Sequence, residues 1–450
     1  MVFFFFMLLA VGSSNFIKIT SAEHLRTEHQ NTADETFMAQ PDRHPHRMVH
    51  YGHYAFRTPS PLGVIDPGLD AVTGQSIFLE GHRQNSALFN ESESAADLGG
   101  LSWLSPALIY QWFAPLLLIL LGYGTVIRER ESSTIATILL QNITALQLLS
   151  GKLLALIIMA VLLLLPMFIT VIMIEGAFAA VLISVVYFIY LSIWSAITVI
   201  TSSVLKQRGS VLISMTSLWL FICLLVPSLA VDLENHHLAH KGKIESDLQM
   251  LTDLRKLGDG HNSNDPAFAN IRANLLREYD VEKVEDLPVN IRGIVAQYAE
   301  EKLTKVLNEY ADERLNIERE QARRLEKFGW LSPSFAMAKV SRSLAGTDLY
   351  HYHQFLRDTE TLRYEFVQGL NEVHAKELAY QDDIKRSIDY EAEKRTRMSA
   401  DNWQVLNKYQ FKPAPFKARV SNAQSSLIII FVWFISLFIG VVIAARVLKP

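Results

Sequence analysis

Two long apolar stretches of this sequence are joined by the charged segment Gly122-Tyr123-Gly124-Thr125-Val126-Ile127-Arg128-Glu129-Arg130-Glu131-Ser132-Ser133-Thr134-Ile135. An apolar run ends where this segment begins, and an amphipathic stretch then leads to Gly151-Lys152 and the next apolar run. The pattern predicts two membrane-spanning helices joined by a compact charged element on one side of the bilayer. A partner in the cytoplasm could push both helices through such an element.

The composition indicates a membrane protein with a sizeable polar portion. The chain has 450 residues, of which 50% are hydrophobic and 20% charged, and the hydrophobic residues are concentrated in blocks. The net charge of −4 is too small to indicate a nucleic-acid partner. The single cysteine, Cys223, lies in an apolar run, so no disulfide is expected within the chain.

Six segments are candidates for crossing the bilayer, which takes about 20 mostly apolar residues in a helix. Five runs meet this length: Leu108–Ile127, Leu153–Ile174, Ala177–Leu205, Val211–Val231 and Leu427–Ala445. The sixth candidate, residues 1–19, is shorter and lacks the basic flank of a signal peptide. We expect it to be a membrane helix, with a cleaved signal as the alternative.

Basic residues near the ends of the spans predict their orientation, because cytoplasmic loops retain lysine and arginine. Three connections or ends carry them: Arg128, Arg130 and Lys152; Lys206 and Arg208; Arg446 and Lys449. The short turn at Glu175-Gly176 carries none. Both chain termini are therefore expected in the cytoplasm.

The expected fold is an all-α integral membrane protein with six transmembrane helices and a large extracytoplasmic helical domain between the fifth and sixth. The expected parts are a first span (1–19, truncated at its start or continued upstream), an extracytoplasmic loop region (20–105), spans two to five (106–231) with a cytoplasmic coupling helix (128–149), the extracytoplasmic helical domain (232–422), and the sixth span with a cytoplasmic C-terminus (423–450).

The second outer segment reads as a bundle of long helices. Apolar residues recur every three or four positions from Ile291 to Tyr310, after a start signal at Asp286-Leu287-Pro288. A similar pattern runs from Phe355 toward Tyr390. Its many charges are typical of a solvated face, and a partner-docking surface is the alternative.

The first outer segment contains clustered histidines, His44, His46, His50 and His53, among turn-forming proline and glycine residues. Such a cluster suits either a metal site or a surface loop. The irregular spacing and the absence of nearby cysteine favour a loop, so no metal ligand is predicted.

No catalytic site is expected. Gly151-Lys152 resembles the end of a phosphate-binding loop, but Leu146 and Leu153 stand where that loop needs a glycine and a hydroxyl. No span pairs a buried acid with a nucleophile. The chain is thus predicted to be no enzyme and to bind no cofactor itself.

Small hydroxyl residues line one face of the fourth span: Ser184, Ser195, Thr198 and Ser202, with Tyr187 nearby. Such residues let helices approach closely and hydrogen-bond to one another. A packing face is the simpler interpretation, and a polar lining for a transported molecule is the alternative.

These features resemble the permease subunits of ABC exporters of the type 2 class. In that class the second span runs into a charged helix with the pattern E-R-E…T…L-L, followed by Gly-Lys. The matching residues here are Arg128, Glu129, Arg130, Glu131, Thr134, Leu139, Leu140, Gly151 and Lys152. A bacterial subgroup with an enlarged outer domain is similar in five further motifs: YGHYAF (51–56), SPL (60–62), DPG (66–68), EGHRQN (80–85) and LAGTD (344–348).

The resemblance implies an exporter in the bacterial inner membrane, with two permease chains, identical or related, and two ATPase subunits. ATP and magnesium would bind the ATPase, and the charged residues 128–131 would pair with charges in its groove. The family normally begins with a basic segment before the first span, and this chain begins in the apolar run. Two alternatives remain: transmission of force to an extracytoplasmic partner protein, and a membrane-anchored scaffold without ATPase.

Overall fold

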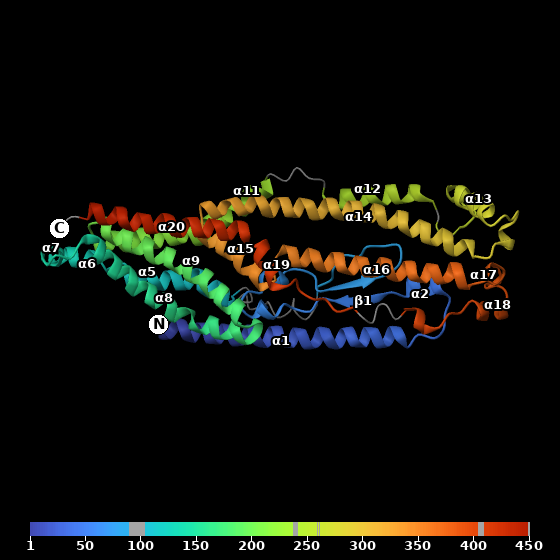
Figure 1. Ribbon diagram of the computed structural model, residues 1–450, viewed down its shortest axis with the longest axis horizontal. Helices are drawn as coiled ribbons and strands as arrows, with labels where there is room; N and C mark the ends of the chain where they lie inside the picture. Colours follow the sequence, from blue (N-terminus) through green and yellow to red (C-terminus); the bar gives the residue numbers. More distant parts are fainter. Residues whose placement is uncertain (90–103, 237–241, 259, 261, 404–408, 449–450) are drawn as a thin grey trace.

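The structure, a computed structural model, describes residues 1–89, 104–236, 242–258, 260, 262–403 and 409–448. Lys449 and residues 90–103 of the expected first outer region lie outside these. The chain forms an elongated molecule with the apolar helices gathered at one end (Figure 1). The apolar helices and their connections are α1 (Val2–Met38), α4 (Pro106–Leu108), the π-helical turn η4 (Ile109–Phe113), α5 (Ala114–Gly122), α6 (Ile127–Glu131), α7 (Thr134–Leu140), α8 (Ala145–Glu175), α9 (Ala177–Val204), α10 (Arg208–Leu220), the π-helical turn η5 (Phe221–Leu225), α11 (Val226–His236) and α20 (Gln424–Val447).

The remaining elements are mostly polar helices. They are α2 (Pro45–Tyr51), β1 (His53–Phe56), β2 (Ser76–Leu79), α12 (Lys243–Leu254), α13 (Ala269–Glu278), α14 (Ile291–Glu326), α15 (Pro333–Ala345), α16 (Leu349–Glu377), α17 (Tyr380–Lys385), α18 (Tyr390–Arg395) and α19 (Phe416–Asn422). Short 3-10 turns lie at Pro61–Val64, Gly68–Ala71, Arg255–Leu257, Pro266–Phe268, Val284–Asp286 and Lys327–Trp330.

The prediction of an all-α protein with six membrane-spanning helices is confirmed. Six helices of the described chain are long and apolar enough to cross a membrane: Val2–Met38, Pro106–Glu131, Ala145–Glu175, Ala177–Val204, Arg208–Glu234 and Gln424–Val447. Their shared core contains Tyr110, Leu163, Tyr190 and Trp194, each buried. The turn between α8 and α9 is made by Gly176 at φ +92°, a conformation that favours glycine.

The distal domain comprises the second half of α1, α2, the β1–β2 hairpin and the helices α12–α14 and α16–α18. Long helices α14 and α16 run side by side in opposite directions along its length (Figure 1). Gly293 permits their closest approach, because a Cβ at this position would lie 2.3 Å from the Ala375 backbone nitrogen. One hydrophobic core joins Phe37, Met48, Val49, Ile77 and Leu79 from the N-terminal region to Phe355, Phe366, Val367, Leu370, Trp403 and Phe411.

The region after residue 19, expected as a loop, is partly helical and partly a hairpin. Helix α1 continues to Met38, and β1 pairs with β2 as an antiparallel hairpin. Polar contacts hold this helical extension: Gln30 accepts a hydrogen bond from the Phe56 backbone (2.9 Å) and donates to the Tyr54 carbonyl (3.0 Å). Since the buried residues between positions 20 and 36, Arg26 and Gln30, are polar, hydrophobic periodicity does not indicate this part of the helix.

Candidate functional site

The charged segment between the second and third spans forms a short, broken element that we call the tip, residues 127–149. Its helices α6 and α7 are separated by Ser133 at φ +61°, and α7 is separated from α8 by Asn142 at φ +61°. The Thr144 hydroxyl and the Gln147 side chain then form a reciprocal cap that starts α8. The expected single coupling helix 128–149 is therefore wrong, because two left-handed residues and a new helix cap interrupt it.

Glu129 holds the tip to the base of α8. Its carboxylate accepts hydrogen bonds from the Thr134 hydroxyl (2.6 Å) and from the Lys152 ammonium (3.1 Å). Three of the residues singled out in the sequence thus meet at one point. Gly151 is exposed beside them, with no atom within 4 Å of a built Cβ.

Arg130 and Glu131 fasten α6 to the connection between α9 and α10. Arg130 donates to the carbonyls of Leu205 (2.7 Å) and Ser203 (2.8 Å), where α9 ends and its carbonyls lack helical partners. Glu131 accepts a hydrogen bond from the Arg208 backbone N–H (3.0 Å) at the start of α10, which suits the positive end of that helix. These two side chains therefore act within the chain.

The outer surface of the tip is apolar as well as charged. Leu140 is 85% exposed, and Ile143 and Leu146 are exposed nearby. Arg128 is exposed too, whereas Leu139 is half-buried against a cluster that includes Ile135 and Leu149. That cluster also contains Val441 and Ala444 of α20, so the C-terminal helix packs against the tip.

Ser202 of the fourth span braces the bend between α5 and α6. Its hydroxyl donates to the Tyr123 carbonyl (2.8 Å) and accepts from the backbone N–H groups of Val126 and Ile127 (3.2 Å each). One side chain therefore satisfies backbone groups that the helix break leaves without helical partners. This contact joins the α5–α6 bend directly to α9.

The other hydroxyls of the fourth span make packing contacts. Ser195 and Thr198 are fully buried and donate to carbonyls of their own helix, those of Leu191 (2.9 Å) and Trp194 (2.8 Å). The Ser184 hydroxyl makes no hydrogen bond among the described residues. Tyr187 points instead into a polar chain, accepting from Gln111 (3.2 Å) and contacting Ser341 (2.7 Å), which in turn donates to Asp66.

Tyr190 is a functional candidate that the sequence reasoning missed. Its hydroxyl donates to the Gln111 carbonyl (2.6 Å) and contacts the Ser334 hydroxyl (2.6 Å). Pro115, four residues after Gln111, has no N–H to give that carbonyl. A proline within an apolar span was the available signal, because a neighbouring helix must then supply a donor.

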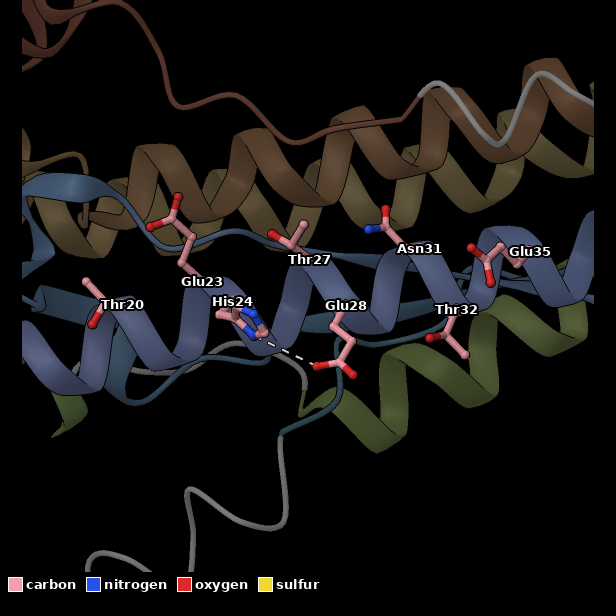
Figure 2. Close-up of a pocket in the computed structure, with 8 residues that line it drawn as sticks. All are labelled: Thr20, Glu23, His24, Thr27, Glu28, Asn31, Thr32 and Glu35. Carbon is pink, nitrogen blue, oxygen red and sulfur yellow. Dashed lines mark ion pairs between the residues drawn. The ribbon is translucent and has the colours of Figure 1, made fainter.

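A shallow hollow on the exposed side of α1 offers no second candidate. All eight residues that line it lie on this single helix: Thr20, Glu23, His24, Thr27, Glu28, Asn31, Thr32 and Glu35. Figure 2 shows these side chains spread along the helix, with His24 and Glu28 forming an ion pair (3.8 Å). The surface is acidic and open.

Comparison with known protein families decides the class. Residues 1–272 match the model described as ABC-2 family transporter protein. The chain belongs to this family. Residues 243–412 match a domain of unknown function, DUF3526, whose range includes α15 and the distal-domain helices α12–α14 and α16–α18. No curated protein and no solved structure matched the chain.

This result confirms the resemblance to type 2 ABC permeases. The chain is a multi-pass membrane protein and the membrane subunit of an ABC transporter. The enlarged domain expected from the sequence corresponds to the DUF3526 match.

Proposed function

We propose that this chain is the permease subunit of an ATP-driven exporter and that a separate ATPase docks on the tip. The observation that carries the proposal is the exposed apolar surface of Leu140, Ile143 and Leu146 on a charged element between two spans. Such a surface is costly in water, and interaction sites commonly pair an apolar centre with a charged rim. Arg128 supplies an exposed charge at that rim.

The internal contacts of the tip refine the expected coupling mechanism. Within the chain, Glu129 binds Lys152, Arg130 binds the end of α9, and Glu131 binds the start of α10. We therefore assign these three residues to force transfer. Contact with the ATPase is left to Arg128 and the exposed leucines. Closure of the ATPase dimer on ATP and magnesium would displace the tip. The contacts of Glu129, Arg130 and Glu131 would then tilt α8, α9 and α10 together, shifting the spans between two arrangements.

Replacement of both exposed leucines tests the docking surface. Leu140→Asp with Leu146→Asp should abolish co-purification of the ATPase in mild detergent while the permease still accumulates in the membrane. Ile388→Asp is the matched control, because Ile388 is equally exposed (87%) but lies in the distal domain. Full retention of the ATPase by the double variant would refute docking at the tip.

Force transmission to an extracytoplasmic partner is a second candidate, and one observation favours it. The spans and the distal domain are joined by continuous structure: α1 extends without a break over 37 residues, or about 55 Å. Tyr187 and Tyr190 of α9 also bind Ser341 and Ser334 of α15. ATPase activity stimulated by a small transported molecule would support export, and stimulation solely by an outer protein would support force transmission.

We further propose that the protein lies in a bacterial inner membrane as a homodimer or a heterodimer with a related permease, with both termini in the cytoplasm. The basic residues near the tip, the α9–α10 connection and the C-terminal helix support this orientation. Cysteine labelling in spheroplasts tests it, since the native Cys223 is buried. A membrane-impermeant maleimide should label Ile388→Cys and leave Leu140→Cys unlabelled, and the reverse pattern would refute the orientation.

A further inference from the structure

Three histidines from two separate parts of the sequence converge in the distal domain. His46 and His50 lie one turn apart on α2, so they share a face of that helix. His82 comes from the EGHRQN motif after β2, with its backbone at φ +64°, an uncommon conformation for a residue other than glycine. Each of the three histidines offers a ring nitrogen, and these nitrogens all lie within 4.8 Å of one another.

The spacing of these rings fits tetrahedral metal coordination. The Nε2 atoms of His46 and His50 are 3.3 Å apart. A tetrahedral Zn²⁺ with Zn–N bonds of about 2.0–2.1 Å separates two ligand nitrogens by about 3.3–3.4 Å. The His50 and His82 rings are also close, with centroids 5.1 Å apart.

The third histidine is oriented by a buried carboxylate on α14. His82 Nδ1 lies 2.8 Å from a carboxylate oxygen of Glu300, which is fully buried. A carboxylate that accepts a hydrogen bond from one ring nitrogen, and so directs the other ring nitrogen toward an ion, is the usual support for a histidine ligand.

Charge and access also suit a cation. Arg363 donates to Glu300 (2.6 Å) and to Glu360 (2.7 Å). Two carboxylates and one guanidinium therefore lie next to the histidines, which leaves an excess of one negative charge. His50 is exposed, while His46 and His82 are half-buried, which leaves an approach from solvent.

We propose that His46, His50 and His82 bind one divalent transition-metal ion, with Zn²⁺ the best match, and that Glu300 positions His82. Imidazole nitrogens suit zinc, copper, iron and nickel, and a tetrahedral site with three protein ligands keeps one position for water or another ligand. This differs from the prediction of a surface loop without metal ligands. The third ligand is distant in sequence from the first histidine cluster, so spacing within that cluster could not indicate it.

A second group in the distal domain, His44, His374 and Asp383, is built differently. Asp383 is buried and contacts both imidazoles (3.1 and 2.9 Å) together with Arg292 and Arg386 (3.4 Å each). Two guanidinium groups already neutralise this carboxylate, and a cation there would be repelled by them. In the part of the chain that the structure describes, a single guanidinium, that of Arg363, pairs with Glu300 behind the His46–His50–His82 group.

Zinc binding to the full-length chain tests the proposal and needs no transport assay. The protein, carrying a histidine-free affinity tag, would be stripped with a chelator and titrated with Zn²⁺ against a chromophoric chelator. Wild type should bind one Zn²⁺ per chain tightly, and hydrogen exchange of residues 45–51 and 80–85 should slow when Zn²⁺ is bound. His50→Ala should weaken binding at least about tenfold, and Glu300→Gln about 10- to 100-fold.

His24→Ala is the matched control, because the His24 side chain is exposed (83%) on α1. It should bind Zn²⁺ like the wild type. Metal-free His50→Ala should keep the exchange pattern of α16; if that pattern changes, His50→Gln replaces it. Equal affinity and stoichiometry in wild type, His24→Ala and the His50 variant would overturn the proposal, as would binding without slower exchange at 45–51 and 80–85.

Discussion

Two glycines in the α14–α16 pair should respond to alanine with opposite signs. Gly293 of α14 faces the α16 backbone, where a Cβ would lie 2.3 Å from the Ala375 nitrogen and 2.6 Å from its Cα. Gly369 of α16 is exposed, and nothing lies within 4 Å of a Cβ built on it. The same chemical change is therefore made once at a tight helix contact and once in open solvent.

The magnitudes follow from two competing effects. Alanine is favoured over glycine inside a helix by about 1 kcal/mol, which applies at both sites. At Gly293 the helices must also move apart by about 1 Å to restore normal contact, and overpacking against backbone atoms, which cannot rotate away, costs about 2–3 kcal/mol, the upper part of the usual range. Gly369→Ala should stabilise the pair by about 1 kcal/mol, and Gly293→Ala should destabilise it by about 1–2 kcal/mol.

Hydrogen exchange measured by mass spectrometry reports these changes locally, without unfolding the membrane spans. Peptides from Ile291–Glu300 and Leu370–Glu377 should exchange about 5- to 30-fold faster in Gly293→Ala. In Gly369→Ala the α16 peptides should exchange about fivefold more slowly. Unchanged or slower exchange in Gly293→Ala would refute the close approach of the two helices at this residue.

Three further predictions concern single polar contacts. Tyr190→Phe should destabilise the membrane core by about 1–3 kcal/mol, since the Gln111 carbonyl receives no hydrogen bond from Pro115. Tyr110→Phe should cost less, because the Leu163 carbonyl that Tyr110 contacts lies inside α8. Equal shifts of the thermal midpoint in detergent for the two variants would contradict this reasoning. Arg130→Ala should speed exchange of residues 127–140 about 5- to 30-fold by freeing the Leu205 and Ser203 carbonyls, and Arg130→Lys should be intermediate. Burial would raise the pKa of Asp348, but the hydrogen bond from His351 and the charge of Lys339 outweigh this effect and hold the pKa below the ordinary value. The stability that this carboxylate contributes is therefore present above about pH 4 and is lost as the pH falls below that value. Asp348→Asn should lower the thermal midpoint more at pH 7 than at pH 3.

The apolar spans were predictable because burial in a bilayer requires about 20 consecutive apolar residues, and this signal needs no knowledge of neighbours. The expected span Ala177–Leu205, for example, is observed as Ala177–Val204. Helix α14 was also indicated, because its apolar periodicity and its flanking signals agree. The signals for both kinds of helix lie within one continuous segment of the sequence.

The features that were missed depend on residues far apart in the chain. The second half of α1 is held by Arg26 and Gln30, which hydrogen-bond to the Arg57 and Tyr54 carbonyls, so its buried face looks like a solvated one. The tip was expected as one helix because Ser133 and Asn142 can both occupy helices, and their left-handed backbone is set by the turns they close. His82 joins His46 and His50 only once β2 and α14 are in place.

Helix α9 connects the tip to α15, the helix that precedes α16 of the distal domain. At one end Ser202 bonds to the α5–α6 bend, and toward the other end Tyr187 and Tyr190 bond to α15. Residues 191–199 between them are buried, and Leu191, Trp194 and Val199 are fully so, which means that bending the helix would disturb close packing. We therefore expect a displacement of the tip to move α15, and with it the start of α16, which follows α15 through the buried Asp348 cap. The same path would serve an exporter that opens toward the distal domain and a device that pulls on a partner there, so stimulation of the ATPase by a small molecule or by an outer protein separates the two functions.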